Sequence, residues 1–345
     1  MSKIIPIASG KGGVGKSTLT ANLALLLSQL GQKVLAVDLD LGASNLHTYL
    51  GVKNSGEGIS ALIQKRVSSL AELIQETPYP NLHIIQGDGL IPGTANLSFF
   101  AKKKIVKGLL GLPYDVILVD LSAGTSANTL DFFLVSNLGL LVTLPETTAV
   151  LNAYAFVKNA LFRLLALRFP PRSDARKLVE EFSQQRLEGS GQTIGNLIED
   201  LHKISPEIGL KAQEAWQNFK PAVVVNSGRS AEDMELGNQL RRVCMKNLEC
   251  DLTYLAFIPH EENARAAQNQ RIPLIQFPTQ PMFAQSLGTL AQLMASATGR
   301  DDSDMIYWEG SETLEDLSVD NTKAQAQDDS DEVEDEEESE DSETF

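Results

Sequence analysis

Residues 10–17 read Gly-Lys-Gly-Gly-Val-Gly-Lys-Ser, a run rich in glycine that contains two lysines and ends in a hydroxyl group. Residues without a Cβ allow successive backbone N–H groups to turn together toward an anion. The Lys16 ammonium can reach the β- and γ-phosphates of a nucleotide, and the Ser17 hydroxyl is a ligand that Mg²⁺ accepts. The run therefore predicts a nucleotide phosphate-binding loop made of Gly10, Lys11, Gly12, Gly13, Val14, Gly15, Lys16, Ser17 and Thr18.

The segments on either side of this loop have the patterns that such a loop requires. Residues 3–8 form an apolar run of strand length, and leucines recur at helical spacing from Ser17 to Leu30. A strand therefore leads into the loop and a helix leaves it, with the positive end of the helix dipole facing the same anion. A chance glycine-rich turn would lack these flanking elements, so we prefer the nucleotide-binding interpretation.

Three aspartates follow two other apolar runs. Residues 34–37 precede Asp38 and Asp40, and residues 116–119 precede Asp120. Because side chains alternate along a strand, Asp38 and Asp40 should leave the strand end on the same side, and Asp120 is placed to reach Mg²⁺ through a water. A single aspartate at a strand end is more often a turn or helix cap. Two such strand ends after a phosphate loop favour a catalytic site.

Taken together, these motifs resemble those of the deviant-Walker P-loop ATPases of the SIMIBI class. The matching residues are Lys11 to Ser17, the pair Asp38 and Asp40, and Asp120-Leu121-Ser122-Ala123-Gly124. The group contains MinD, ParA, FlhG and Mrp, with the nitrogenase iron protein as a distant relative. The resemblance covers residues 1 to about 297 in the order of the motifs.

The resemblance implies roles for the matching residues. In this family the signature lysine, here Lys11, crosses a dimer interface to the ATP of the partner subunit, so the ATP-bound form should be a homodimer. Asp40 would polarise the attacking water, and Asp38 would lie near Mg²⁺ and its waters. With ATP and Mg²⁺ as cofactors, the expected catalytic residues are Lys11, Lys16 and Asp40, and the expected metal-site residues are Ser17, Asp38 and Asp120.

Two residues near the end of the domain are expected at the nucleotide base. Asn226 matches the asparagine that many family members use to read adenine, and Pro259 resembles the segment that lines the other side of the base. Ligands of parallel sheets collect beyond the carboxyl ends of the strands, where both residues should lie. His260 is expected to be a surface or turn residue.

Two other residues have competing interpretations. Asn45 matches a MinD-like position close to the nucleotide and the dimer face, but it is equally suited to cap a helix over Leu46–Leu50. Glu146 could face the nucleotide, and a cap for the helix that follows it is the simpler account.

The residues after Asp120, which match the family's second switch segment, and the cysteines indicate the branch of the family. Ser122 and Ala123 stand where partition and Mrp proteins usually have two prolines, which favours the MinD and FlhG type. Cys244 and Cys250 are separated by five residues on a predicted helix, too far apart for one shared metal, and free cysteine is usually buried. An iron–sulfur carrier of the Mrp type and a ParA-like partition ATPase are the alternatives.

Apolar runs that alternate with helical patterns predict the fold class. We expect an α/β domain over residues 1–297, with a mostly parallel sheet and helices on both faces in a Rossmann-like three-layer arrangement. Residues 161–219 read as a helical insertion, which is either a passive layer over the sheet or a site of partner choice. The later strands are expected at 82–85, 116–119, 138–144, 222–225 and 252–258.

Residues 298–345 are expected to form a disordered acidic tail. Residues 301–345 contain 20 of the 45 acidic residues and one of the 29 basic residues, so they carry a formal charge of −19 against +3 for the rest of the chain. A segment of this composition cannot repay the entropy of folding. The tail is a solubilising appendage, a segment that docks a basic partner, or an autoinhibitory cover for lysines 102–104 and 107. The apolar island at 306–308 is expected to pack onto the domain.

Composition also bears on location and partners. There is no N-terminal signal and no uninterrupted apolar run of 18 or more residues, so we expect a cytoplasmic protein. The last apolar helix, near residues 282–294, lacks basic residues, and the acidic tail would be repelled by anionic lipid. Recruitment to a membrane or pole should therefore use a protein adaptor, and DNA binding is not expected.

From these patterns we expect a slow, partner-stimulated ATPase. It would act as an ATP-driven dimerisation switch in cellular positioning, at the division site or in flagellar placement. Besides the iron–sulfur carrier and the partition ATPase, a module that binds ATP without hydrolysing it is the other alternative.

Overall fold

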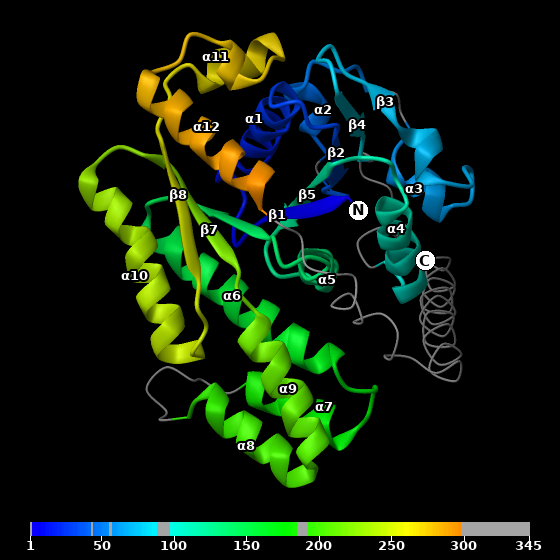
Figure 1. Cartoon of the computed structure of the whole chain (residues 1–345), viewed down its shortest axis with the longest axis vertical. Coiled ribbons are helices and arrows are strands. Elements are labelled where there is room, and N and C mark those ends of the chain that lie inside the picture. The colour runs from blue at the N-terminus through cyan, green and yellow to red at the C-terminus, as the bar shows by residue number, and fades with distance from the viewer. Residues whose placement is uncertain (1, 43, 55–56, 88–96, 185–191, 298–345) are drawn as a thin grey trace, which may run out of the picture.

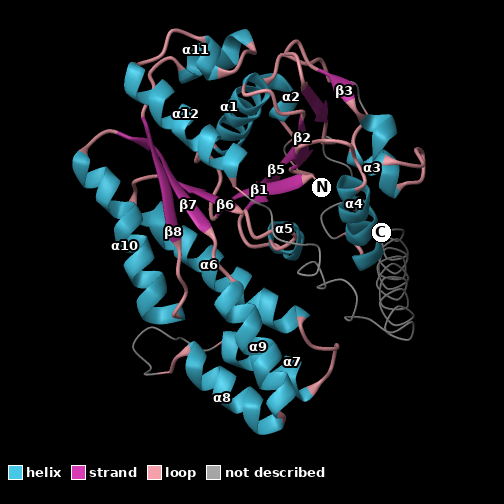
Figure 2. Cartoon of the chain, in the orientation of Figure 1, coloured by secondary structure: helices cyan, strands magenta, loops and turns pink. Residues whose placement is uncertain are grey.

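The computed structural model describes residues 2–42, 44–54, 57–87, 97–184 and 192–297. The expectations for the acidic tail and for the apolar island at 306–308 lie outside the described residues. The predicted fold class is confirmed: a mostly parallel sheet is covered by helices on both faces (Figures 1 and 2).

The sheet has eight strands in the order β3-β4-β2-β5-β1-β6-β7-β8. All neighbouring pairs are parallel except β3 with β4, which closes one edge. The bounds are β1 Lys3–Ser9, β2 Val34–Leu39, β3 Gln75–Glu76, β4 Leu82–Ile85, β5 Val116–Ala123, β6 Leu140–Thr143, β7 Ala222–Gly228 and β8 Thr253–Pro259.

The helices pack the two faces of this sheet into two apolar cores, because strand residues alternate between them. On β5, Ile117 and Val119 belong to one core, and Val116 and Leu118 to the other. The helix bounds are α1 Lys16–Gln29, α2 Leu46–Tyr49, α3 Ile59–Ile63, α4 Phe99–Leu110, α5 Ala127–Phe133, α6 Thr147–Leu167, α7 Asp174–Ser183, α8 Ile194–Ile204, α9 Pro206–Asn218, α10 Ala231–Leu248, α11 Ala264–Gln270 and α12 Pro281–Ser296, with 3₁₀ turns η1 Leu70–Leu73 and η2 Leu274–Gln276.

The structure differs from the predicted elements in three places. Asp120 lies inside β5, because the strand continues to Ala123, where it pairs with Ser9 of β1. The edge strand β3 is two residues long and polar, so no apolar pattern marks it. Cys250 follows the end of α10, whereas Cys244 lies within it.

Both thiols are nonetheless buried, as predicted. Burial raises the pKa of Cys244 to about 12 and also raises the pKa of Cys250. Both groups therefore stay protonated at neutral pH and behave as small apolar side chains.

Helices α7, α8 and α9 form a lobe at the far end of α6 (Figure 1). Their buried side chains, among them Val179, Leu197 and Ala212, belong to the same core as α6. Gly209 of α9 has to be a glycine, because a Cβ there would come 2.1 Å from the His202 ring of α8. The range 161–219 therefore begins inside the continuous helix α6 and continues into this lobe.

Helix α6 is long and apolar enough, by length and composition, to cross a membrane. In the protein, however, 56% of its most apolar window is buried. Core helices of soluble proteins pass the same test, so α6 is weak evidence for a membrane span.

The depth of this core can be tested on α6. Leu165 is fully buried there, whereas Leu210 of α9 is 55% exposed. We expect Leu165→Ala to lower the free energy of unfolding by about 2–5 kcal/mol, since a cavity adds to the lost transfer free energy. The matched Leu210→Ala should change it by less than about 0.5 kcal/mol. Urea unfolding monitored by circular dichroism measures both, and equal effects would contradict the assigned packing.

Candidate nucleotide-binding site

The loop between β1 and α1 adopts a backbone that depends on its glycines. Gly13 and Gly15 have positive φ angles of 79° and 86°, and α1 begins directly after Gly15. A Cβ on Gly15 would come 2.4 Å from Asn226 Nδ2, and one on Gly10 would come 2.3 Å from the Asn152 carbonyl oxygen. Gly12 and Gly13 have nothing within 4 Å of a Cβ position, so this part of the loop borders open space.

Lys16 and Asp120 form a buried ion pair beneath this loop. Lys16 Nζ lies 2.9 Å from Asp120 Oδ1, and the two side chains are only 8% and 1% exposed. Burial raises the pKa of Asp120, and the Lys16 charge opposes that rise. Asp120 Oδ2 is buried with no hydrogen-bond partner among the described residues. A buried carboxylate oxygen in this position is suited to a divalent cation or to one of its waters, so the residues present fit Mg²⁺.

Asp38 lies beside Asp120 in the register of β2 and β5. Its Oδ1 accepts from the Asp40 backbone N–H at 2.9 Å. Its Oδ2 accepts from the Ser44 hydroxyl and from the backbone N–H groups of Asn45 and Leu46, at 2.8, 3.1 and 3.0 Å. Asp38 therefore holds the segment after β2, and its role beside Mg²⁺ remains a prediction.

The helix-capping alternative for Asn45 is only half correct. Asn45 occupies the position before α2, but its side chain makes no capping hydrogen bond. The N–H groups at this helix end are satisfied by Asp38 instead.

The electrostatic cost of burying Asp38 is large. Burial, together with the negative charge of Asp120, raises the pKa of Asp38 to about 7. The hydrogen bonds from Leu46, Ser44 and Asp40 oppose that rise, because they favour the ionised carboxylate. A cation bound beside the two neighbouring aspartates would therefore favour the ionised form of Asp38.

Asp40 joins the segment after β2, the first switch segment, to the end of β5, the second switch segment. Its Oδ1 accepts a hydrogen bond from the Ser122 hydroxyl at 3.1 Å, and Ser122 is two residues beyond Asp120 on β5. The side chain is half-buried, in contrast to the buried Asp38 and Asp120. Asp40 can therefore meet a solvent molecule at the rim of the site.

Lys11 is held by Glu146 of the same chain. Lys11 Nζ lies 2.7 Å from Glu146 Oε2, and the two side chains are 28% and 56% exposed. Glu146 precedes α6, but its side chain makes no capping hydrogen bond, so the capping interpretation was wrong for the carboxylate. The structure shows instead an ion pair between residues that are 135 positions apart.

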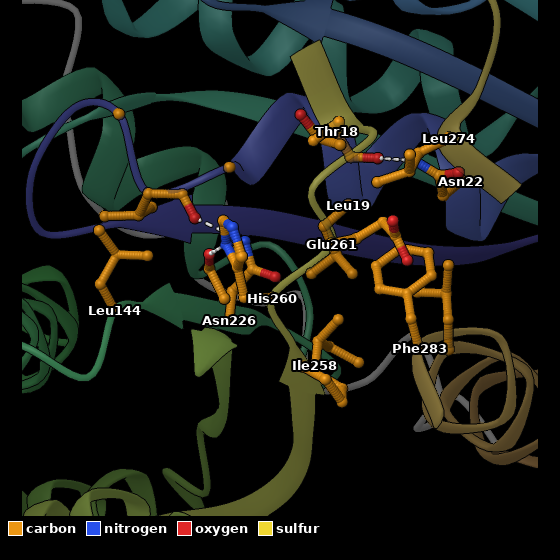
Figure 3. Close-up of a pocket in the computed structure, with 17 residues that line it drawn as sticks. Thr18, Leu19, Asn22, Leu144, Asn226, Ile258, His260, Glu261, Leu274 and Phe283 are labelled. Carbon is orange, nitrogen blue, oxygen red and sulfur yellow. Dashed lines mark hydrogen bonds between the residues drawn. The ribbon is translucent and has the colours of Figure 1, made fainter. Parts of the chain in front are cut away.

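A cavity of about 230 Å³ opens beside the phosphate loop. Asn226 and Pro259 both line it, and Asn226 Nδ2 donates to the Val14 carbonyl oxygen at 2.8 Å (Figure 3). Both residues therefore lie at the carboxyl ends of their strands and beside the loop. Their contact with a base remains a prediction.

Sequence reasoning missed most of the other cavity walls. His260 is the half-buried residue that follows β8, and it lines the cavity together with Ser227, a position that the sequence analysis did not assign to it. The position of His260 directly after the strand-end Pro259 was the available signal. The apolar walls come from distant elements, and no local pattern marks them: Leu19 of α1, Leu274 of η2, and Phe283 and Leu287 of α12.

Comparison with known proteins identifies relatives of this chain. The family model described as CobQ/CobB/MinD/ParA nucleotide binding domain matches residues 5–274. The flagellum site-determining protein YlxH of Helicobacter pylori is 39% identical over 163 residues, which are 46% of this chain and 53% of the relative. The septum site-determining protein MinD of the same organism is 34% identical over 151 residues, covering 44% and 56%. The chain thus spans about half the length of the curated relatives it matches.

Solved structures show the same fold. MinD from Pyrococcus horikoshii, complexed with Mg-ADP, aligns with a TM-score of 0.58 and 24% identity, over 86% of this chain and 97% of that one. A chain of the MinC:MinD cell division protein complex from Aquifex aeolicus aligns with a TM-score of 0.53 and 20% identity, over 87% of this chain and 98% of that one. At these identities the likeness concerns the fold.

The raised pKa of Asp38 predicts a pH-dependent stability. The folded state keeps this proton up to about pH 7, whereas the unfolded chain releases it near the ordinary pKa of an aspartate, 3.8. Stability should therefore fall as pH rises from about 4 to 7, by at most about 1.4 kcal/mol per pH unit, and should level off above 7.

Urea unfolding between pH 5 and 8 in EDTA, with wild type and Asp38→Asn compared, measures this effect. The variant should show the weaker decline. Asp174→Asn, whose carboxylate is 87% exposed, should follow the wild type. Parallel pH profiles for wild type and Asp38→Asn would contradict the burial-induced shift.

Proposed function

Because the chain belongs to the CobQ/CobB/MinD/ParA nucleotide-binding domain family, we propose that it is a Mg²⁺-dependent ATPase that dimerises with ATP bound. The observation that carries the proposal is the buried Lys16–Asp120 pair beneath an open glycine loop, with one Asp120 oxygen unpartnered among the described residues. The cycle would switch partner binding in cellular positioning, at a division site or in flagellar placement. The names of the septum and flagellum site-determining relatives support that process.

The phosphate loop would bind the triphosphate. Backbone N–H groups of residues 12–17 would face the phosphates, and Lys16 would exchange its contact with Asp120 for the β- and γ-phosphates. Ser17 and Asp120 would hold Mg²⁺, and Asp38 would act on its waters from the second strand. When bound, Mg²⁺ neutralises charge on the phosphate oxygens.

Asp40 would orient the attacking water. Its half-buried carboxylate is positioned by Ser122, which lies on the same strand as the metal-site Asp120. Any closing of the second switch segment would move Ser122 and Asp40 together. Hydrolysis would accordingly be slow until a partner or a second subunit orders both segments.

Lys11 would cross to the nucleotide of the partner subunit. To do so it must leave Glu146, and a surface ion pair of this exposure is worth at most about 1 kcal/mol. Moving Lys11 from Glu146 to the nucleotide therefore costs little free energy. In the monomer, Glu146 would hold the Lys11 side chain.

We assign the domain to 1–297 and the acidic tail to 298–345, and we expect a protein adaptor to bring this cytoplasmic domain to its site.

Two substitutions test the catalytic part of the proposal. Asp40→Ala should lower the single-turnover rate of ATP hydrolysis by about 100-fold or more, the usual contribution of a proton-handling group, while ATP still binds. With ATP and Mg²⁺, this variant should accumulate as a dimer in light scattering. Adding Lys11→Ala to it should return the protein to a monomer.

Lys211→Ala is the matched control, because Lys211 is exposed on α9 in the helical lobe. It should hydrolyse ATP and dimerise as the wild type does. A monomer under every nucleotide condition would refute the dimer switch, and Asp40-independent hydrolysis would refute the role of Asp40.

A further inference from the structure

The exposed face of α4 carries lysines and no carboxylate. The helix reads Phe-Phe-Ala-Lys-Lys-Lys-Ile-Val-Lys-Gly-Leu-Leu, without an acidic residue. Lys103, Lys104 and Lys107 are exposed, and positions three or four apart share one face of a helix. Phe100, one turn earlier on that face, is 54% exposed. The four side chains therefore present positive charge beside an exposed aromatic ring.

Two more cations extend this face past the end of α3. Lys65 and Arg66 follow α3 and are exposed. The Lys104 ammonium donates to the Leu62 carbonyl oxygen at 3.4 Å, which brings the end of α3 against α4. We call the surface made of Lys65, Arg66, Phe100, Lys103, Lys104 and Lys107 the basic face.

The described part of the chain supplies few carboxylates to this face. Glu57 accepts from Arg66 at 3.0 Å, so one of the cations is paired. Among the described residues, no carboxylate forms an ion pair with Lys65, Lys104 or Lys107. The basic face therefore has unbalanced positive charge within the domain.

The layer beneath the basic face does not balance this charge either. Asp131 of α5 is buried, and its carboxylate accepts from two cations, Lys102 of α4 at 2.7 Å and Arg163 of α6 at 2.6 Å. Two positive charges thus meet one negative charge. The group adds one positive charge in excess below α4.

The described chain ends on the side of the molecule where α4 ends. The Lys3 ammonium donates to the Ala295 carbonyl oxygen in the last turn of α12. The Ser2 hydroxyl donates at 2.8 Å to the carbonyl oxygen of Leu112, two residues after the end of α4. Residues 2 and 3 therefore bridge the ends of α12 and α4 at the amino edge of the sheet (Figure 1). The chain continues from Ala297 at this edge.

The sequence that follows is a polyanion long enough to reach the basic face. From Asp328 to Glu343 it has twelve acidic residues and no basic one. Residues 298–327 can span up to about 100 Å when fully extended, whereas α4, with 12 residues, is about 18 Å long. A tethered segment that can reach its site has an effective concentration on the order of 1 mM there. A separate polyanion lacks this advantage.

We propose that the acidic run 328–343 docks on the basic face of its own chain and screens that face from other polyanions. Charge complementarity selects this occupant, because residues 301–345 carry −19 and the rest of the chain +3. Each exposed pair contributes little, so the contact depends on several pairs acting together and weakens as salt rises. The inference goes beyond the proposed function and does not depend on nucleotide binding.

A carbodiimide cross-linker, which joins an ammonium group to a carboxylate in contact with it, tests the docking in the full chain. Links from lysines 65, 103, 104 and 107 to residues 328–343 should exceed those from Lys211, exposed on α9, by at least about 5-fold, since several weak pairs act together. Sodium chloride at about 0.5 M should remove most of these links, because it shortens the Debye length to about 4 Å. Mass spectrometry measures the yields. Equal yields at Lys211 would overturn the basic face as the docking site.

A mixture of ¹⁵N-labelled and unlabelled protein separates docking within one chain from docking between chains. Docking within one chain should link only peptides that carry the same label. Mixed-label links at the frequency of random pairing would place the run on a second copy and would overturn the proposal.

Binding of fluorescent poly-L-glutamate measures how far the basic face is covered. A full-length variant with the twelve acidic residues of 328–343 changed to Asn or Gln should bind this probe at least about 10-fold more tightly than wild type, because the tethered competitor is lost. Adding Lys103→Glu and Lys107→Glu should abolish the gain, whereas adding Lys211→Glu should leave it. These lysines are exposed, so circular dichroism should show the wild-type fold in every variant. Equal affinity of wild type and the tail-neutralised variant would overturn the proposal.

Discussion

The ion pair between Lys16 and Asp120 joins the phosphate loop to the centre of the sheet. Each side chain is almost fully buried, so each charge depends on the other for compensation. Lys16 begins α1 and Asp120 lies inside β5, next to β1 in the strand order. The pair therefore requires that the strand, the loop and the helix keep their relative positions. Asp38 of β2 lies beside Asp120 in the sheet, and Asp40 follows the end of β2.

The carboxyl edge of the parallel sheet explains why the other groups gather here. Strands β2, β5, β7 and β8 all run in the same direction, so residues that follow them meet at one edge. This edge holds Asp40, which follows β2, and the strand-end residues Ser122, Asn226 and Pro259. The location of the site thus follows from the common direction of the strands. Neighbouring helices supply apolar walls of the cavity.

Much of this could be predicted from the chain itself. Apolar runs locate the parallel strands, and local motifs locate the glycine loop and the three aspartates, because each of these signals lies within a few residues. The ion pair of Lys11 with Glu146 could not be predicted, since it joins residues that approach only when β6 lies beside β1. The cavity walls from α12 were missed for the same reason. The bulge at Ser227, where the pairing of β7 with β8 shifts register, is likewise marked by no residue pattern.

Helix α6 has a mechanical consequence for the whole molecule. Near its first turn, the Asn152 carbonyl oxygen approaches Gly10 so closely that no side chain fits between them, and its far end carries the lobe of α7, α8 and α9. A continuous helix of 21 residues is a stiff rod about 31 Å long. A small tilt of this rod at the phosphate loop becomes a displacement several times larger at the lobe, in the way that a lever enlarges the motion of its short arm.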